Sequence, residues 1–250
     1  MPANEAVRKR LLTWYRRHGR DLPWRRSRDP YHIWISEVML QQTQVETVIP
    51  YYHRFLNAFP DVAALAAAPQ SAVLKHWEGL GYYARARNLH KAAQQVVQEH
   101  GSQLPRTPED LRRLPGIGRY TAAAVASIAF GQDTVALDGN LHRVLCRLFA
   151  IDDDPGRPNT QRTLEYLALS MLPAGQAGDF NQALMDLGAT LCRRSRPACD
   201  DCPVAADCVA RREGRQAELP APRPRREARP SGNAPRPAWP RRPGCAPRRP

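Results

Sequence analysis

Four cysteines lie within 17 residues near the end of the chain, and they constrain the fold more than any other feature. Their spacing is Cys192-x6-Cys199-x2-Cys202-x5-Cys208. A secreted disulfide framework normally spreads its cysteines more widely, whereas a cluster of this kind in a cytosolic protein is typical of metal binding. Four thiolates on one short loop are able to hold either a 4Fe–4S cluster or a tetrahedral zinc ion, and the spacing alone does not separate the two.

The composition indicates a cytosolic protein with an anionic partner. No apolar run approaches the roughly 18–20 residues that cross a bilayer, and the N-terminus is too charged for a signal peptide. The net charge is +13, but 12 of the 37 basic residues and 3 of the 24 acidic ones lie in 211–250. The charge therefore supports nucleic-acid binding only weakly. Three of the basic residues are lysines, Lys9, Lys75 and Lys91, and this scarcity bears on the mechanism.

Apolar residues recur with helical periodicity along most of the chain, and no convincing pair of alternating strands is present. The fold class expected is therefore all-α. From about residue 217 the chain consists mainly of Pro and Arg with almost no aliphatic residues, and we interpret this segment as disordered. Helices are expected near 7–15, 32–41, 44–58, 61–67, 71–78, 83–99, 120–130, 160–171 and 179–191, with further helix starts at Thr107-Pro108 and Asp138.

A glycine-rich turn, Leu-Pro-Gly-Ile-Gly at 114–118, separates two of these helices. Gly116 and Gly118 allow the backbone to turn tightly and to approach a phosphate, which the N–H groups of the turn and of the next helix are able to hold. Arg119 directly follows and fits a phosphate contact. The same turn also serves as a simple connection between helices, so the motif alone leaves both interpretations open.

Asp138 begins a helix about 20 residues after this turn. Its ordinary role is that of a helix N-cap. A carboxylate at a helix N-terminus is also favoured in its ionised form, and an ionised carboxylate stabilises a positive sugar centre. The two roles are compatible.

Glu37 stands in the run Ser-Glu-Val-Met-Leu-Gln-Gln-Thr-Gln-Val at 36–45. Glu37, Gln41 and Gln44 recur at i, i+4 and i+7, which predicts that they share one helix face while Val38 and Met39 face the core. A Glu on a helix surface is most often only solvated, so this position gains meaning from the resemblance described below.

A further stretch, Gly-Leu-Gly-Tyr-Tyr-Ala-Arg-Ala-Arg-Asn-Leu at 79–89, places aromatic residues beside glycines and arginines. Tyr82 at such a loop tip is able to wedge between bases, and the arginines that follow are candidates for phosphate contacts. Packing of Tyr82 against its own domain explains the pattern equally well.

Together these motifs resemble the MutY-type adenine DNA glycosylases of the helix–hairpin–helix superfamily, over residues from about 5 to 210 and including Phe-Asn-Gln-Ala-Leu-Met-Asp-Leu-Gly at 180–188. The resemblance implies a two-lobed helix–hairpin–helix DNA glycosylase fold with a C-terminal iron–sulfur cluster loop. It divides the chain into a discontinuous helical iron–sulfur domain (1–28 and 133–212), a six-helix barrel domain with the hairpin (29–132) and a disordered tail (213–250).

The resemblance also implies roles for single residues. Glu37 is expected to protonate adenine N7, and Asp138 to stabilise the sugar cation with support from Tyr120 and Asn140. The adenine pocket is expected to contain Trp24, Arg25, Leu40 and Gln182. The expected DNA contacts are an intercalating Tyr82, Gln41 opposite it, and Gly116, Gly118 and Arg119 of the hairpin. One 4Fe–4S cluster is expected on Cys192, Cys199, Cys202 and Cys208.

The function implied is hydrolysis of the N-glycosidic bond of adenine mispaired with 8-oxoguanine or guanine. A lyase needs an amine for a Schiff base. In endonuclease III a lysine follows the last hairpin glycine by two residues, and Tyr120 occupies that position here, so we expect a monofunctional enzyme. The alternatives are an endonuclease III-like glycosylase and lyase acting on oxidised pyrimidines, disfavoured by Glu37 and Tyr120, and a DNA-binding module without catalysis.

The chain departs from the family pattern at its end. MutY proteins normally continue into a C-terminal domain that reads 8-oxoguanine, whereas this chain runs into Arg/Pro repeats after Glu227. We expect that domain to be lacking here, as the result of a shifted or shortened reading frame or, as an alternative, because a basic arm replaces it. The partner expected is double-stranded DNA containing adenine mispairs, bound by a monomer in a bacterial cytoplasm and at the nucleoid.

Overall fold

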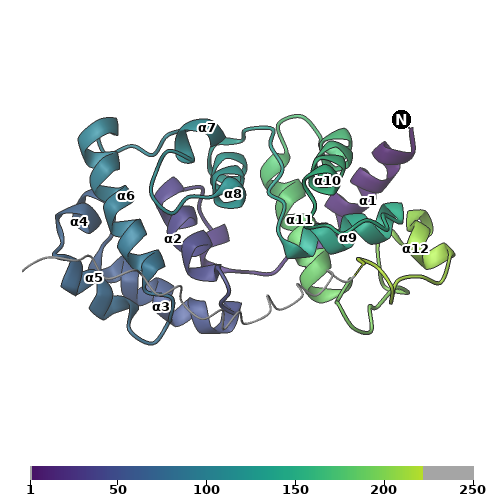
Figure 1. Cartoon of the computed structure of the whole chain (residues 1–250), viewed down its shortest axis with the longest axis horizontal. Helices are drawn as coiled ribbons and strands as arrows, with labels where there is room; N and C mark the ends of the chain where they lie inside the picture. Colours follow the sequence, from purple (N-terminus) through teal and green to yellow (C-terminus); the bar gives the residue numbers. More distant parts are fainter. Residues whose placement is uncertain (1, 222–250) are drawn as a thin grey trace, which may run out of the picture.

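The computed structural model describes residues 2–221, and every regular element among them is a helix (Figure 1). This confirms the predicted all-α class. No helix in the described part is long and apolar enough to span a membrane. The helices are α1 (Pro2–His18), η1 (Pro23–Arg25), α2 (Pro30–Leu40), α3 (Val45–Ala58), α4 (Val62–Ala67), α5 (Gln70–Trp77), α6 (Ala84–His100), α7 (Pro108–Leu111), α8 (Arg119–Phe130), α9 (Gly139–Phe149), α10 (Pro158–Met171), α11 (Ala177–Thr190), η2 (Ala205–Asp207) and α12 (Val209–Arg212).

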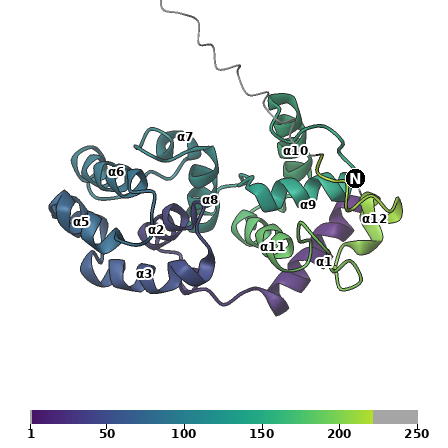
Figure 2. The same cartoon turned by 60° about the horizontal axis from the view of Figure 1, so that its bottom comes forward.

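The helices form two lobes with separate apolar cores, one from α2–α8 and the other from α1 and α9–α12 (Figures 1 and 2). Trp34, Phe55 and Trp77 are fully buried in the first core, and Leu11 and Phe180 in the second. The chain crosses between the lobes twice, after α1 and after α8. Burial of each such side chain contributes about 1.5–3 kcal/mol, so each core stabilises its own lobe.

Helix α8 lies at the junction and contributes to both cores. Ala122 and Ala126 belong to the first core, whereas Ala123 and Ala124 belong to the second. The small side chains let neighbouring helices approach closely. A Cβ atom on Gly178 of α11 would lie 3.0 Å from a backbone oxygen of α8. The Ala-rich sequence of α8 thus positions its first turn, which faces the space between the lobes.

Side-chain caps fix the starts of several helices. Thr107 Oγ1 accepts a hydrogen bond from the amide of Asp110 at 3.2 Å and so caps α7, whose start agrees with the predicted helix start at Thr107-Pro108. The carboxylate of Asp29 caps α2 through the amides of Tyr31 and His32. Asp138 caps α9, as its position before a helix predicted. Such caps stabilise a helix start by about 1 kcal/mol and fix where the chain enters it.

Two sequence predictions differ from the structure. Helix α2 ends at Leu40, because the backbone of Gln41 is no longer helical (ψ 108°) and Gln42 is left-handed (φ 58°), so Gln41 and Gln44 follow the helix and do not extend the face of Glu37. Residues 213–221, expected to belong to a disordered tail, are instead placed against the second lobe: Leu219 is buried, and its carbonyl accepts a 2.8 Å hydrogen bond from Arg147 Nε. The remainder of the predicted tail, 222–250, lies outside the described residues.

Candidate active site

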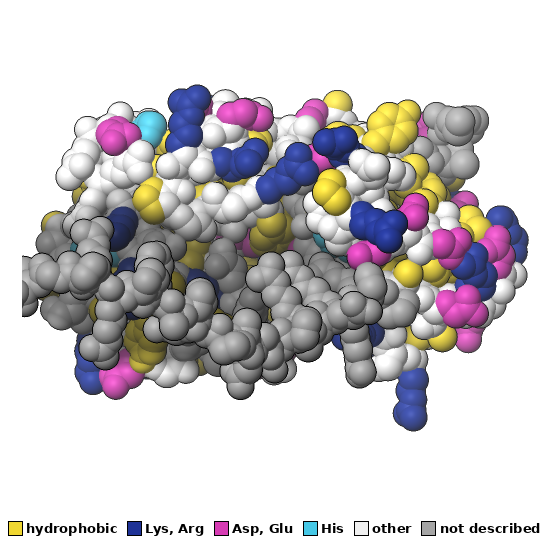
Figure 3. Space-filling model, viewed as in Figure 1, with side chains coloured by type: hydrophobic (Ala, Val, Ile, Leu, Met, Phe, Trp, Pro, Cys, Tyr) yellow, Lys and Arg dark blue, Asp and Glu magenta, His cyan; other side chains and the backbone are white. Residues whose placement is uncertain are grey.

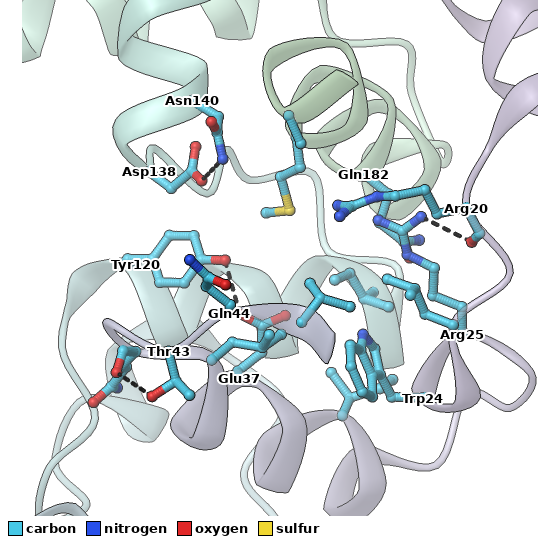
Figure 4. Close-up of a pocket in the computed structure, with 18 of the residues that line it drawn as sticks. Arg20, Trp24, Arg25, Glu37, Thr43, Gln44, Tyr120, Asp138, Asn140 and Gln182 are labelled. Carbon is cyan, nitrogen blue, oxygen red and sulfur yellow. Dashed lines mark hydrogen bonds between the residues drawn. The ribbon is translucent and has the colours of Figure 1, made fainter. Parts of the chain in front are cut away.

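A cavity of about 770 Å³ opens between the two lobes, and the carboxyl groups of Glu37 and Asp138 both lie on its wall (Figure 4). Glu37 comes from α2 and Asp138 from the start of α9, so the site requires both lobes. The structure brings together in this cavity all the residues predicted to act in catalysis or to hold the base, with Gln41 at its edge: Trp24, Arg25, Glu37, Leu40, Tyr120, Asp138, Asn140 and Gln182.

Glu37 is almost fully buried, with 5% of its surface exposed. The phenol of Tyr120 on α8 donates a hydrogen bond to its Oε2 at 2.8 Å. Burial raises the pKa of Glu37 to about 7; the hydrogen bond from Tyr120 opposes the rise, Asp138 adds to it, and Arg25 lowers it. A carboxyl group with this pKa is able to carry a proton at neutral pH and to release it to a leaving group.

Asp138 has a different environment, in which several donors face its carboxylate. The amide of Leu141 donates to Oδ1 at 2.7 Å, and Asn140 Nδ2 donates to Oδ2 at 2.9 Å. Burial raises the pKa of Asp138 above its ordinary value, while the hydrogen bonds from Leu141 and Asn140 oppose that rise. The two carboxyl groups therefore differ in their hydrogen-bond donors, as expected where one is an acid and the other an ionised stabiliser.

A chain of hydrogen bonds connects Asp138 to the cysteine loop. Asn140 is linked to Asp138 and accepts a 2.7 Å hydrogen bond from Arg143 Nη2. Arg143 Nε in turn donates to the carbonyl of Cys192 at 2.8 Å. Sequence analysis missed Arg143, whose only signal was its place one turn after Asn140 on the same helix.

The side of the cavity opposite Asp138 contains Trp24 and Arg25, from the connection between α1 and α2 (Figure 4). The guanidinium of Arg25 is held by both carboxylate oxygens of Asp186, at 2.7 and 2.9 Å. Sequence analysis missed Asp186, because the partners are 161 positions apart and no local pattern connects them. Gln182 lies one turn before Asp186 on α11 and completes this wall.

Tyr82 is the most exposed aromatic residue of the first lobe, with 61% of its surface accessible and a left-handed backbone (φ 50°). Arg85, expected to be a candidate for phosphate contact, points inward instead and lies 5.3 Å from the Tyr82 ring. Its guanidinium joins the Tyr82 loop to the end of α2. Its acceptors are the carbonyls of Val38, Met39, Gln41, Leu80 and Gly81 and the hydroxyl of Thr43.

The glycine-rich turn leads into α8 as the motif predicted. Gly116 has a positive φ of 79°, and a Cβ there would lie 2.7 Å from the Cβ of Asn88 on α6. Gly118 precedes the first turn of α8, which no side chain caps, and a Cβ on Gly118 would meet open space. Arg119 is exposed and lies 3.5 Å from Glu165. Lys and Arg side chains lie over α7 and towards α10 on this face (Figure 3).

The four clustered cysteines line a common small pocket together with Arg147. Arg147 Nη1 lies 3.4 Å from the sulfur of Cys192, and the sulfur of Cys208 lies 3.4 Å from the Arg147 carbonyl. Within residues 2–221, no group of three or more His, Cys, Asp or Glu side chains is arranged to hold a metal ion as it stands. The donor set, four thiols facing one pocket, nevertheless fits a thiolate-ligated cofactor.

Sequence comparisons relate the chain to a known family and to curated proteins. Residues 35–168 match the family described as "HhH-GPD superfamily base excision DNA repair protein". The chain is 49% identical to a human adenine DNA glycosylase over 223 residues, which cover 86% of this chain and 41% of the human protein. It is 42% identical to an adenine DNA glycosylase of Buchnera aphidicola, covering 79% of this chain and 56% of that protein. The chain thus spans about half the length of these relatives.

The fold is similar to those of a solved thymine-DNA glycosylase and of endonuclease III. A thermostable thymine-DNA glycosylase is 31% identical with a TM-score of 0.78, and the match covers 85% of this chain and 98% of that one. Endonuclease III, trapped in a covalent intermediate with DNA, is 23% identical with a TM-score of 0.70, covering 83% and 95%. The second likeness concerns the fold alone.

Proposed function

Because the chain belongs to the HhH-GPD superfamily of base excision DNA repair proteins, we propose that it is an adenine DNA glycosylase. The relatives with that name are up to 49% identical to it. The observation that carries the proposal is the buried Glu37, hydrogen-bonded to Tyr120 and facing a cavity that also contains Asp138. A buried acid and a second, hydrogen-bonded carboxylate are the groups that cleavage of a glycosidic bond requires.

In the proposed mechanism, Glu37 gives its proton to N7 of adenine, because adenine is a poor leaving group unless it is protonated. The C–N bond electrons stay with the departing base, and the sugar becomes positively charged. Asp138 stabilises this charge as an anion, with Asn140 holding its carboxylate. A water molecule then completes the hydrolysis, and Glu37, now ionised, is placed to activate it.

We propose that the enzyme removes the base without cutting the strand. A lyase requires an amine on the cavity wall to form a Schiff base. Tyr120 occupies the position expected for that amine, and its hydroxyl is directed to Glu37. None of the residues that line the cavity is a lysine.

We propose that double-stranded DNA containing adenine opposite 8-oxoguanine or guanine is bound by a monomer across the face that carries the glycine-rich turn and Tyr82. The target base lies inside the duplex, so it must be turned out into the cavity. The exposed Tyr82 would fill the gap. Arg85 donates to the carbonyl of Gln41 and lies against the Tyr82 ring, so it connects the two residues. Gly116, Gly118 and Arg119 are the proposed phosphate contacts.

We propose that the four clustered cysteines hold one 4Fe–4S cluster. When bound, this cofactor would cross-link the loop at 192–208 and so fix the second lobe. Arg147 neutralises negative charge beside the thiolates and ties the loop to α9 through the carbonyls of Arg193 and Arg194. We keep the predicted domains, 1–28 with 133–212 and 29–132, as proposed folding units.

The decisive experiment is a single-turnover assay on duplexes with adenine opposite 8-oxoguanine and opposite guanine, each with and without alkali. The proposal predicts adenine release, with strand breaks only after alkali treatment. Strand cleavage without alkali, at the rate of base release, would instead favour a lyase. A Glu37→Gln variant with full adenine release would exclude the mechanism.

A further inference from the structure

A buried carboxylate outside the catalytic pair lies beside the cavity. The side chain of Asp186 on α11 is fully buried, and two arginines from the connection between α1 and α2 surround it. Arg20 donates to it from its backbone amide at 2.9 Å and from Nε at 2.7 Å. Arg25 donates from both Nη atoms. Both oxygens of the Asp186 carboxylate therefore accept hydrogen bonds from the connection that leads from one lobe to the other.

Arg25 stands between Asp186 and the cavity. It is 11% exposed, lines the cavity, and lies 5.7 Å from the centre of the Tyr15 ring. Both of its terminal nitrogens are held by Asp186, and Nη1 also donates to the carbonyl of Arg20 at 3.2 Å. A guanidinium held on this edge is unable to turn into the cavity.

The charge of Arg25 matters because it acts on the carboxyl group of Glu37. The charged and titratable groups near Glu37 are Tyr120 from α8, Asp138 from the start of α9, and Arg25 from η1. A cation near a carboxyl group favours its ionised form. Left without a partner, Arg25 would draw the proton away from Glu37, and it would be free to pair with the Glu37 carboxylate directly.

We propose that Asp186 is a positioning residue that holds Arg25 against the cavity wall and offsets its charge, so that Glu37 keeps its proton at neutral pH. This inference rests on the proposed function. Asp186 acts through Arg25 and does not touch the base or Glu37. The catalytic acid in one lobe thus depends on a carboxylate in the other lobe.

The test is the pH profile of single-turnover adenine release. The rate should fall at alkaline pH as Glu37 loses its proton. In Asp186→Asn this decline should move to lower pH by roughly half a unit or more, because the charge of Arg25 is no longer offset. In Arg25→Gln it should move to higher pH, even though the rate itself falls. Asp186→Glu keeps the charge and should keep the decline at the wild-type pH.

Asp21→Asn is the matched control, since Asp21 forms an exposed ion pair with Arg26 in the same connection. Its profile should coincide with that of the wild type. Opposite shifts for Asp186→Asn and Arg25→Gln would support the inference, because general disruption of the fold does not give opposite signs. Unmoved profiles, or shifts in the same direction, would overturn it. If Asp186→Asn does not fold, Asp186→Glu and Arg25→Gln decide together: the inference requires the wild-type profile in the first and an upward shift in the second, and any other result overturns it. Absence of adenine release by the wild type would reject the proposed function itself.

Discussion

The phenol of Tyr120 donates a 2.8 Å hydrogen bond to Oε2 of Glu37, and this contact joins α8 to α2 across 83 positions of the sequence. Under the proposed function, Tyr120 stands where a lyase would carry a lysine amine, and Glu37 is the proposed acid. The contact would then link the expected absence of lyase chemistry with the protonation of that acid.

Tyr120→Phe should move the alkaline decline of adenine release to higher pH. The hydrogen bond stabilises the ionised form of Glu37 and so lowers its pKa, against a burial effect that raises it. Removing the hydroxyl leaves burial unopposed by this contact, and the pKa rises above about 7. Single-turnover rates between pH 6 and about 9 measure the shift. Tyr166→Phe on α10, where the ring is 71% exposed, is the control. A decline displaced to lower pH would show that Tyr120 stabilises the protonated acid instead.

Glu37→Gln should remove a loss of stability that the wild type suffers at alkaline pH. The folded-state pKa of Glu37 is about 7 against an ordinary value of 4.5. Below pH 4.5 Glu37 is protonated in both the folded and the unfolded state, so its burial carries no cost of ionisation. The unfolding free energy declines as the pH rises from there through about 7, by about 3 kcal/mol in all. Gln stays neutral throughout.

Urea denaturation of both proteins at pH 4.5 and 8.5 checks this prediction. The quantity compared is the unfolding free energy of Glu37→Gln minus that of the wild type. This difference should be more favourable to the variant by about 3 kcal/mol at the higher pH. Glu46→Gln, at an exposed position on the cavity edge, is the control and should show no such gain. An equal difference at both pH values would mean that folding does not raise the pKa of Glu37.

The sequence was informative where function is encoded locally. Asp138 precedes a helix about 20 residues after the glycine-rich turn, and Glu37 lies in a run that resembles the MutY pattern, so the resemblance predicted that both belong to one site. The helix end at Leu40 could not be predicted, because it arises from the non-helical backbone of Gln41 and the left-handed backbone of Gln42. The contact between Asp186 and Arg25 spans 161 positions and arises only when α11 packs beside the connection after α1.

Arg85→Lys should loosen the Tyr82 loop. The guanidinium of Arg85 reaches acceptors on both the end of α2 and the loop at 80–81, whereas the single ammonium of lysine cannot satisfy them all. We expect a loss of about 2 kcal/mol in unfolding free energy and faster amide hydrogen exchange at 79–84. Arg87→Lys, at an exposed position two residues on, is the matched control. Unchanged exchange in Arg85→Lys would show that the loop is fixed by other contacts.

Cys199→Ser should lose iron and visible absorption, because one of four thiolates in the shared pocket is removed. Cys146→Ala is a matched control, since Cys146 is buried in the second core and does not line that pocket. It should keep about four iron atoms per chain even if its stability falls. Stoichiometric zinc and a colourless wild-type protein would contradict the proposed cluster.

Gly116→Ala and Gly118→Ala should separate the structural from the DNA-binding part of the glycine-rich turn. Alanine at 116 meets two penalties, a positive φ of 79° and a Cβ only 2.7 Å from that of Asn88, so α6 must move away from the turn. We expect a loss of at least 1–2 kcal/mol in unfolding free energy.

Alanine at 118 has an extended backbone and open space before it, so the unfolding free energy should change by less than about 1 kcal/mol. The added methyl group nevertheless occupies the space through which a phosphate would approach the uncapped amides of α8. Affinity for duplex DNA, measured by fluorescence anisotropy at fixed salt, should therefore fall in Gly118→Ala without loss of stability. Wild-type affinity in Gly118→Ala would contradict the prediction and would mean that the phosphate is bound elsewhere.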